Sequence, residues 1–204
     1  MGRGGKAGLI AAGWLAGALP VLADDLPEKL AEKLAEKLAE KLAPCLACHG
    51  VEGQSILEYV PSLGAQTAPY ALIQLFMFRE KMRVAEPMTE AAQGLSDGDL
   101  QAMSDALAAQ PPPKPPDDPG DPTRLERARA VTEQHRCNFC HRPDYSGQQS
   151  VPRLADQRED YLLKTLREYK SGARRAYEPI MVEVLQPTDD SQLIEFAYYL
   201  SHLR

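Results

Sequence analysis

The pentapeptide Cys45-Leu46-Ala47-Cys48-His49 recurs 92 residues later as Cys137-Asn138-Phe139-Cys140-His141, and the two copies use every cysteine of this 204-residue chain. Two thiols three residues apart can add to two vinyl groups on one edge of a porphyrin, and the histidine that follows then lies beneath the ring. The pattern is typical of c-type haem attachment. It predicts two covalently bound c-type haems, with Cys45, Cys48, Cys137 and Cys140 as attachment residues and His49 and His141 as iron ligands.

Other uses of paired cysteines explain this pattern less well. A thioredoxin-like redox site needs a βαβ context, which the sequence around neither pair indicates. A zinc site built from both pairs would have to bridge 88 residues, from 49 to 136, which is far more than the spacing of zinc ribbons. Neither alternative explains a histidine after each pair.

The N-terminus has the pattern of an export signal. A short basic region precedes an apolar run rich in Ala and Gly over residues 7–22, and acidic residues begin at Asp24. This pattern predicts a signal peptide over residues 1–23, cleaved after Ala23, and therefore a periplasmic protein. An uncleaved membrane anchor is the alternative, although the run is short for a span and contains Pro20.

The rest of the chain repeats one plan. Each half ends with a helix signal, for which Ser96 and Thr188 are the predicted N-caps, because acidic residues follow each of them in the first turn. Between the pentapeptides and these helices, three segments match in order: residues 61–66 with 152–157, residues 70–79 with 161–170, and residues 86–88 with 178–181.

A proline-rich segment separates the two copies. Residues 111–120 have five prolines among the first six positions, so they can form neither a helix nor a central strand. We expect an extended connector between domain 1, residues 24–110, and domain 2, residues 121–204. The Glu-Lys-Leu-Ala repeats over residues 28–43 are predicted to form the ordinary first helix of domain 1, rather than an added coiled coil or spacer.

Each haem also needs a sixth iron ligand or an open position. Met181 is the only methionine of the second half and follows Cys137 by 44 residues, while Met88 follows Cys45 by 43 residues in a similar Glu-Pro context. We therefore predict Met88 and Met181 as axial ligands. A thioether opposite an imidazole raises the reduction potential and fills the last coordination position. The methionines without a counterpart in the second half are Met77, Met82 and Met103.

Negative charge is concentrated in the first half. Residues 24–110 carry 7 Lys and Arg against 14 Asp and Glu, whereas residues 121–204 carry 13 of each sign. This balance argues against nucleic acid or an anionic membrane surface as a partner, so membrane contact is expected only through partner proteins. Arg136, Arg142 and Arg153 lie near the second pentapeptide and suggest docking of an acidic redox partner. A solvated surface, or pairing with haem propionates, is the plainer interpretation of these arginines.

With its two pentapeptides, its duplication and its two methionines, the chain resembles di-haem class I cytochromes c of the c4 type over residues 24–204. The Pro-x-Leu-x-x-Gln segments and the Tyr-Leu…Tyr-Lys-Ser-Gly-x-Arg run over residues 161–174 carry the resemblance. It implies an all-α fold with two tandem class I cytochrome c domains joined by the proline-rich connector. It also implies that the carbonyls of Pro61 and Pro152 accept a hydrogen bond from the second nitrogen of each ligand histidine, which would fix the ring orientation.

One turn of the first half departs from this pattern. The chain has Glu80-Lys81 where its own second half has Ser171-Gly172, a glycine turn.

Together these features predict an electron-transfer protein and not an enzyme. We expect single electrons to pass from a respiratory or dehydrogenase donor to a terminal acceptor, such as an oxidase or another cytochrome. The alternative is a tightly bound electron-accepting haem subunit of a flavin- or quinone-dependent dehydrogenase, because the second domain also resembles the haem subunit of flavocytochrome c sulfide dehydrogenases. A di-haem peroxidase would need an open or displaceable position on one iron, and a methionine for each haem argues against it.

Overall fold

The computed structural model describes Met1 and residues 25–174 and 179–203. The predicted cleavage after Ala23 lies outside these residues. The contacts divide the chain into two compact units, residues 1–36 and residues 37–204. Within the described part of the chain, no helix is both long enough and apolar enough to cross a membrane.

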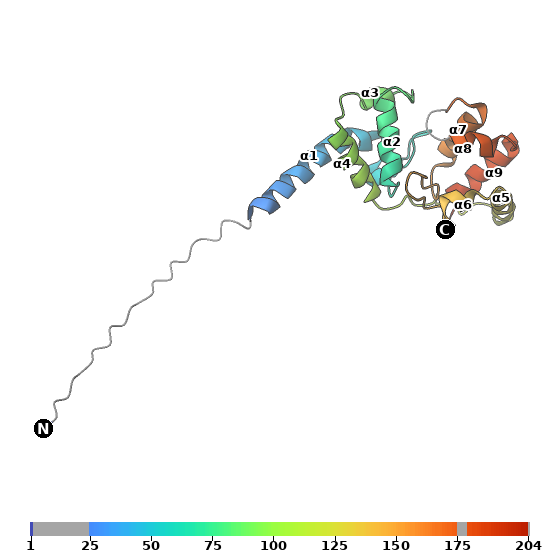
Figure 1. The fold of residues 1–204 in the computed structure, drawn as a ribbon. Helices are drawn as coiled ribbons and strands as arrows, with labels where there is room; N and C mark the ends of the chain where they lie inside the picture. The colour runs from blue at the N-terminus through green and yellow to red at the C-terminus, as the bar shows by residue number, and fades with distance from the viewer. Residues whose placement is uncertain (2–24, 175–178, 204) are drawn as a thin grey trace. The chain divides into compact units, whose positions relative to one another are not determined.

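Helices make up the regular structure of the described residues, as Figure 1 shows, and beyond them only an isolated bridge pairs Gln148 with Val151. The all-α fold class is therefore confirmed. In chain order the elements are α1 (Asp25–His49), the 3₁₀ turn η1 (Val51–Gly53), α2 (Ala68–Arg79), α3 (Met88–Ala91), α4 (Asp97–Ala108), α5 (Pro122–Gln134), α6 (Cys137–His141), α7 (Glu159–Ser171), α8 (Pro179–Leu185) and α9 (Asp190–Ser201).

The helix predicted over residues 28–43 is present and is longer than expected. It includes Pro44 and ends only at His49, so α1 carries the first pentapeptide on its last turns. A proline inside a helix removes one backbone hydrogen bond. Leu42, two residues before this proline, is buried against α4. This packing supports the helix across Pro44.

The second half reaches its pentapeptide through two helices. Asp121 accepts a hydrogen bond from the backbone N–H of Arg124 (2.6 Å) and begins α5, which ends at Gln134. Arg136 then takes the left-handed conformation, with φ 54°, and α6 begins at Cys137. Non-glycine residues seldom adopt this conformation. At Arg136 it separates α5 from α6, directly before the first cysteine of the pentapeptide.

Hydrophobic side chains form two separate clusters along the chain. The first contains Leu42, Met103 and Leu107, which join α1 to α4. The second lies around α7 and α9 and includes Leu193 and Phe196, both almost fully buried. In the first half α2 packs against α4, and in the second half α7 packs against α9 and α5 also packs against α9. The matching helix pairs agree with the duplication read from the sequence.

The two final helices are capped at matching positions of the halves, once the residue inserted within 178–181 is counted. Ser96 caps α4, as predicted, because its hydroxyl accepts from the N–H of Asp99 while the Asp99 carboxylate accepts from the N–H of Ser96. The predicted cap Thr188 is wrong. Asp189 caps α9 instead and forms the same reciprocal pair with Gln192, while the Thr188 hydroxyl donates to the carbonyl oxygen of Leu185 (2.6 Å).

The connector, residues 111–120, forms neither helix nor strand, as its proline content predicts. Gln54 holds its middle by two hydrogen bonds of 3.2 Å, one from the N–H of Lys114 and one to the carbonyl oxygen of Lys114. At the end of the connector, the N–H of Asp121 donates to the hydroxyl of Tyr198 (2.7 Å). The connector is thus fixed to side chains of both halves.

Lys81 makes the turn of the first half without a glycine. Its φ is 56°, and Gly172 at the matching position of the second half has φ 72°. The chain therefore makes the same left-handed turn after α2 and after α7, although a side chain at this φ adds local strain of about 1 kcal/mol.

Candidate functional site

Each pentapeptide ends in a buried histidine held by one hydrogen bond. His49 is 4% exposed and His141 is 5% exposed. Nδ1 of His49 lies 2.8 Å from the carbonyl oxygen of Pro61, and Nδ1 of His141 lies 2.8 Å from that of Pro152. A carbonyl oxygen only accepts, so each Nδ1 carries the proton and each Nε2 keeps a free lone pair, as an iron ligand requires.

Burial also favours the neutral form of these rings. It lowers the pKa of His49 and of His141 because desolvation penalises the charged imidazolium, and the hydrogen bond to the proline carbonyl opposes this effect only in part. Both imidazoles are therefore neutral at neutral pH. Neutral imidazole is the form that binds a metal.

None of the four cysteines forms a disulfide, and exposure differs within each pair. Cys48 and Cys140 are exposed, whereas Cys45 and Cys137 are half-buried. Burial raises the pKa of the Cys45 thiol and raises that of Cys137 to about 11. A thioether carries no charge, so these half-buried positions suit the linkage.

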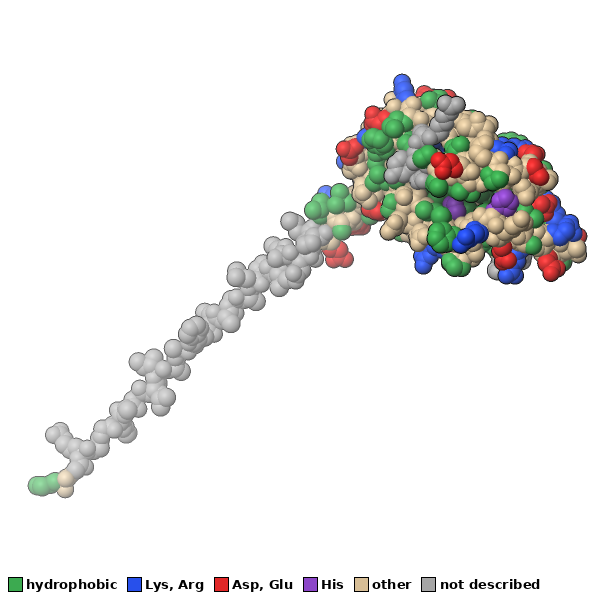
Figure 2. All heavy atoms as spheres, turned by 45° about the vertical axis from the view of Figure 1, so that its right-hand side comes forward, with side chains coloured by type: hydrophobic (Ala, Val, Ile, Leu, Met, Phe, Trp, Pro, Cys, Tyr) green, Lys and Arg blue, Asp and Glu red, His purple; other side chains and the backbone are tan. Residues whose placement is uncertain are grey.

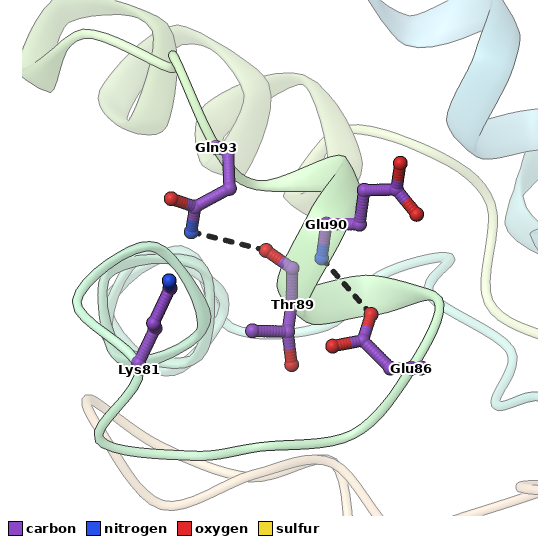
Figure 3. Close-up of a pocket in the computed structure, with 5 residues that line it drawn as sticks. All are labelled: Lys81, Glu86, Thr89, Glu90 and Gln93. Carbon is purple, nitrogen blue, oxygen red and sulfur yellow. Dashed lines mark hydrogen bonds between the residues drawn. The ribbon is translucent and has the colours of Figure 1, made fainter.

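The segment that carries Met88 is held by side-chain hydrogen bonds (Figure 3). The N–H of Glu90 donates to the carboxylate of Glu86 (3.2 Å), and the amide of Gln93 donates to the carbonyl oxygen of Thr89 (3.1 Å). The same amide donates to the carbonyl oxygen of Arg79 at the end of α2 (2.9 Å). Met88 itself is half-buried, and the bonds around it fix the backbone from which its thioether projects.

The segment that carries Met181 is α8, and its C-terminal end is capped by a lysine. The ammonium of Lys170 on α7 donates to the carbonyl oxygens of Gln186 (3.0 Å) and Thr188 just after α8. Met181 is half-buried and packs against the hydrophobic cluster of the second half. Of the competing methionines, Met77 and Met103 are buried in the core and Met82 is exposed.

Exposed hydrophobic side chains occur close in sequence to both pentapeptides and both methionine segments. On the face drawn in Figure 2, histidine side chains lie among hydrophobic ones. Large apolar side chains left in water are unfavourable, and a porphyrin offers an apolar face to cover them. The buried neutral histidines, the cysteine pairs and these side chains together fit a covalently held haem. The exposed residues are Val51, Ile56, Leu57, Met82, Val84, Phe139, Ile180 and Val184.

Polar contacts between the two halves were not foreseen from the sequence. Gln66 and Gln157 each make two hydrogen bonds to the backbone of the other half, at Arg153 and Ser62 respectively. The sequence did signal these glutamines, since they occupy matching positions of the duplicated Pro-x-Leu-x-x-Gln segments. It could not show that each of them faces the opposite copy.

A buried arginine makes the second group of contacts between the halves. Arg174 is 7% exposed, and its Nη2 donates to the hydroxyl of Tyr70 (3.0 Å) and to Oε1 of Gln74 (3.2 Å) on α2. Its Nη1 lies within hydrogen-bonding distance of Thr165 (3.3 Å), and its guanidinium lies 5.0 Å from the ring centre of Tyr169. One cation of the second half therefore satisfies polar groups of both halves.

The three arginines near the second pentapeptide do not share one environment. Arg136 and Arg142 are exposed, and the guanidinium of Arg136 lies 5.7 Å from the ring centre of the exposed Phe139. Arg153 has only 15% of its side chain exposed and pairs with Asp156 at 3.5 Å. The expectation that Arg153 presents a free charge to a partner is therefore wrong, because the fold has already paired it.

Comparison with known proteins gives consistent relatives. No family model matches the chain. The chain is 32% identical over 168 residues to cytochrome c4 of Thiocapsa roseopersicina, covering 78% of this chain and 86% of that protein. It is 28% identical over 174 residues to the thiosulfate dehydrogenase electron acceptor of Stutzerimonas stutzeri, covering 78% of each. The solved structure of reduced recombinant cytochrome c4 from Pseudomonas stutzeri matches with a TM-score of 0.75 and 26% identity, over 83% of this chain and 98% of that chain.

These similarities extend over both halves of the chain. The fold is that of cytochrome c4 structures, with two tandem class I cytochrome c domains joined by a proline-rich connector. The cofactors are two covalently bound c-type haems, for which the cysteine pairs have the required spacing, and the chain is an electron carrier and not an enzyme. This chain belongs to the cytochrome c4 family of di-haem electron-transfer proteins.

Proposed function

We propose that this protein is a periplasmic shuttle that carries single electrons from a respiratory or dehydrogenase donor to a terminal acceptor. One observation carries the proposal: a buried histidine with Nδ1 bonded to a proline carbonyl stands directly after each Cys-x-x-Cys pair. When bound, the haem supplies a reversible one-electron change at iron. The protein's part is to hold the ligands in place and to keep water away from them.

We assign the axial ligands as His49 with Met88 and His141 with Met181. The Pro61 and Pro152 carbonyls orient the two rings, and the half-buried positions of both methionines support their role. A thioether at the last coordination position leaves no place for oxygen, peroxide or substrate, which suits electron transfer. Cys45, Cys48, Cys137 and Cys140 form the four thioether links.

The domain boundaries and the export signal belong to the same proposal. Domain 1 comprises residues 24–110 and domain 2 comprises residues 121–204, which agrees with the two separate hydrophobic clusters. Residues 1–23 form the signal peptide, with cleavage after Ala23. The intact mass of the exported protein tests both the cleavage and the loading: it should equal residues 24–204 plus two haems.

The partners we propose are other redox proteins, with different charges for the two halves. The first half has an excess of acidic residues, while Arg136 and Arg142 are exposed beside the second pentapeptide next to Phe139. Exposed charges act mainly on the rate of encounter and are screened within about 8 Å at physiological salt. The second half then meets an acidic partner and the first half a basic one.

A second candidate is a permanently bound electron-accepting subunit, and the name of the Stutzerimonas stutzeri relative, a thiosulfate dehydrogenase electron acceptor, favours it. Stopped-flow electron transfer with isolated donor and acceptor proteins distinguishes the two. A shuttle slows as salt rises, and Arg142→Glu slows transfer with the acidic partner only. The matched control, Arg127→Glu on α5, changes the charge equally and should have a smaller effect. Rates that respond neither to salt nor to Arg142→Glu would favour the bound subunit.

A further inference from the structure

The side chain of Gln157, in the second half, forms hydrogen bonds to Ser62, next to the proline carbonyl that accepts from His49 in the first half. Its Oε1 accepts from the N–H of Ser62 (2.8 Å), and its Nε2 donates to the carbonyl oxygen of Ser62 (2.8 Å). That N–H belongs to the Pro61–Ser62 peptide, and the carbonyl oxygen of the same peptide accepts from Nδ1 of His49. One planar peptide group therefore links Gln157 to His49.

The opposite half repeats this arrangement. Oε1 of Gln66 accepts from the N–H of Arg153 (2.8 Å), and its Nε2 donates to the carbonyl oxygen of Arg153 (3.2 Å). The Pro152 carbonyl of that same peptide group accepts from Nδ1 of His141. Each half thus supplies a glutamine that binds the peptide group next to the histidine of the other half.

The orientation of both side-chain amides is fixed by their neighbours. Oε1 of Gln157 also accepts from the N–H of Arg158, and Oε1 of Gln66 also accepts from the N–H of Thr67, each at 3.0 Å. Two backbone donors face each Oε1, so the reversed amide would place N–H against N–H. Both glutamines are buried, at 7% and 6% exposure for Gln66 and Gln157, where hydrogen bonds are little weakened by water.

Hydrogen bonds in series strengthen one another by about 10–30% per bond. A glutamine oxygen that accepts from the peptide N–H makes the carbonyl oxygen of that peptide more negative. The carbonyl then attracts the Nδ1 proton more strongly, and Nε2 becomes a better electron donor. A more basic imidazole stabilises ferric iron, so the link lowers the reduction potential of the haem that it serves.

We infer that Gln157 and Gln66 are positioning residues that set the potential of the haem in the opposite half, through the Pro61–Ser62 and Pro152–Arg153 peptide groups. The inference rests on His49 and His141 as the proposed iron ligands. Substituting a glutamine in one half should therefore change the reduction potential of the haem in the other half. A purely structural role would instead affect the half that contains the substituted residue, or both halves alike.

The test is spectroelectrochemical titration of the full-length holoprotein, with each potential assigned to its half by NMR. Gln157→Met keeps the size of the side chain but removes the acceptor. It should raise the ferrous-to-ferric ratio of the first haem about threefold at fixed applied potential, about 28 mV for one electron, since tenfold is 59 mV. The second haem should stay unchanged. Gln66→Met should give the mirror result.

The matched control is Gln54→Met. Gln54 makes the same two bonds to the backbone of Lys114, at 3.2 Å each, but this peptide holds no histidine, so neither potential should move. The Nδ1 proton resonance of His49 should shift upfield in Gln157→Met, which reports the weaker bond independently of the potential.

A shift of the second haem in Gln157→Met, or no shift of either haem with His–Met spectra intact, would overturn the link and leave the proposed function standing. If the unsubstituted protein lacks His–Met ligation, the proposed ligands are wrong. The Nδ1 proton of His49 still decides the link in that case: an unmoved resonance rejects it, and a shifted one supports it.

Discussion

Each pentapeptide histidine commits one ring nitrogen to a proline carbonyl and leaves the other free. The sequence named both histidines because their place after two cysteines admits few other uses. It also named both prolines, through a family resemblance rather than through spacing. The hydrogen bonds of the two glutamines could not be predicted from the sequence, because Ser62 and Gln157 are 95 positions apart and no local pattern pairs them.

Substitution of Met181 tests ligand assignment at the level of a single residue. Met181→Ala should open the second haem to carbon monoxide in the reduced protein, while Met181→His should keep it low-spin and lower its potential. Optical spectra with and without carbon monoxide measure both effects. In the first half, Met88→Ala should open the first haem, whereas the exposed Met82 serves as its control, and Met82→Ala should change nothing. An unchanged spectrum in Met181→Ala would contradict the assignment.

Local rules predicted the helices well and their ends less well. Ser96 was identified as a cap because Asp99 follows at the right spacing, and the structure has that reciprocal pair. Thr188 was predicted because acidic residues follow it in the first turn, but Asp189 is an equally favourable cap and this pattern does not separate adjacent candidates. Packing decides: the Thr188 hydroxyl is buried and bonded to Leu185, which leaves the exposed Asp189 to begin α9.

The contact between Lys41 on α1 and Asp99 on α4 predicts a pH-dependent stability. Hydrogen bonds from Lys41 and Ser96 hold the pKa of the Asp99 carboxyl well below its usual range. Because the folded-state pKa is the lower one, the stabilisation is present above the unfolded-state pKa, near about 4, and is lost as pH falls toward the folded-state pKa. Asp99→Asn should therefore lower stability at pH 7, and its difference from the unsubstituted protein should shrink in acid.

Urea unfolding followed by circular dichroism at neutral and acid pH measures this difference. Asp117→Asn in the connector removes the same charge from an exposed position and serves as the control. A loss of stability in Asp99→Asn that is equal at both pH values would show that the charge of Asp99 is not what stabilises the contact.

The two halves are joined by polar groups that only the folded chain brings together. Arg174 of the second half reaches Tyr70 and Gln74 of the first, and Gln66 and Gln157 cross in both directions. The sequence predicted the duplication and the connector, since repeated segments indicate the first and proline content indicates the second. It could not predict this interface, because the same residue types would serve equally well on a solvated surface.

Removing Arg174 should weaken the protein as a whole. Arg174→Met keeps much of the side-chain volume but removes the donor to the Tyr70 hydroxyl and one of the two donors to Oε1 of Gln74, which also accepts from Arg83. The free energy of unfolding should therefore fall by about 2–3 kcal/mol. Arg167→Met is the control, because Arg167 pairs with Asp190 in an exposed position where solvent screens the pair. Urea unfolding of the holoprotein measures both, and equal losses would contradict the role given to Arg174.

The central claim is that each chain carries two six-coordinate haems that exchange electrons one at a time. Reductive titration of the purified holoprotein, with optical spectra recorded at each step and carbon monoxide added at the end, tests this most directly. We expect two electrons taken up per chain, low-spin spectra throughout and no binding of carbon monoxide to the reduced protein. Uptake of a single electron per chain, or carbon monoxide binding to either reduced haem, is incompatible with a carrier whose irons are both closed by methionine.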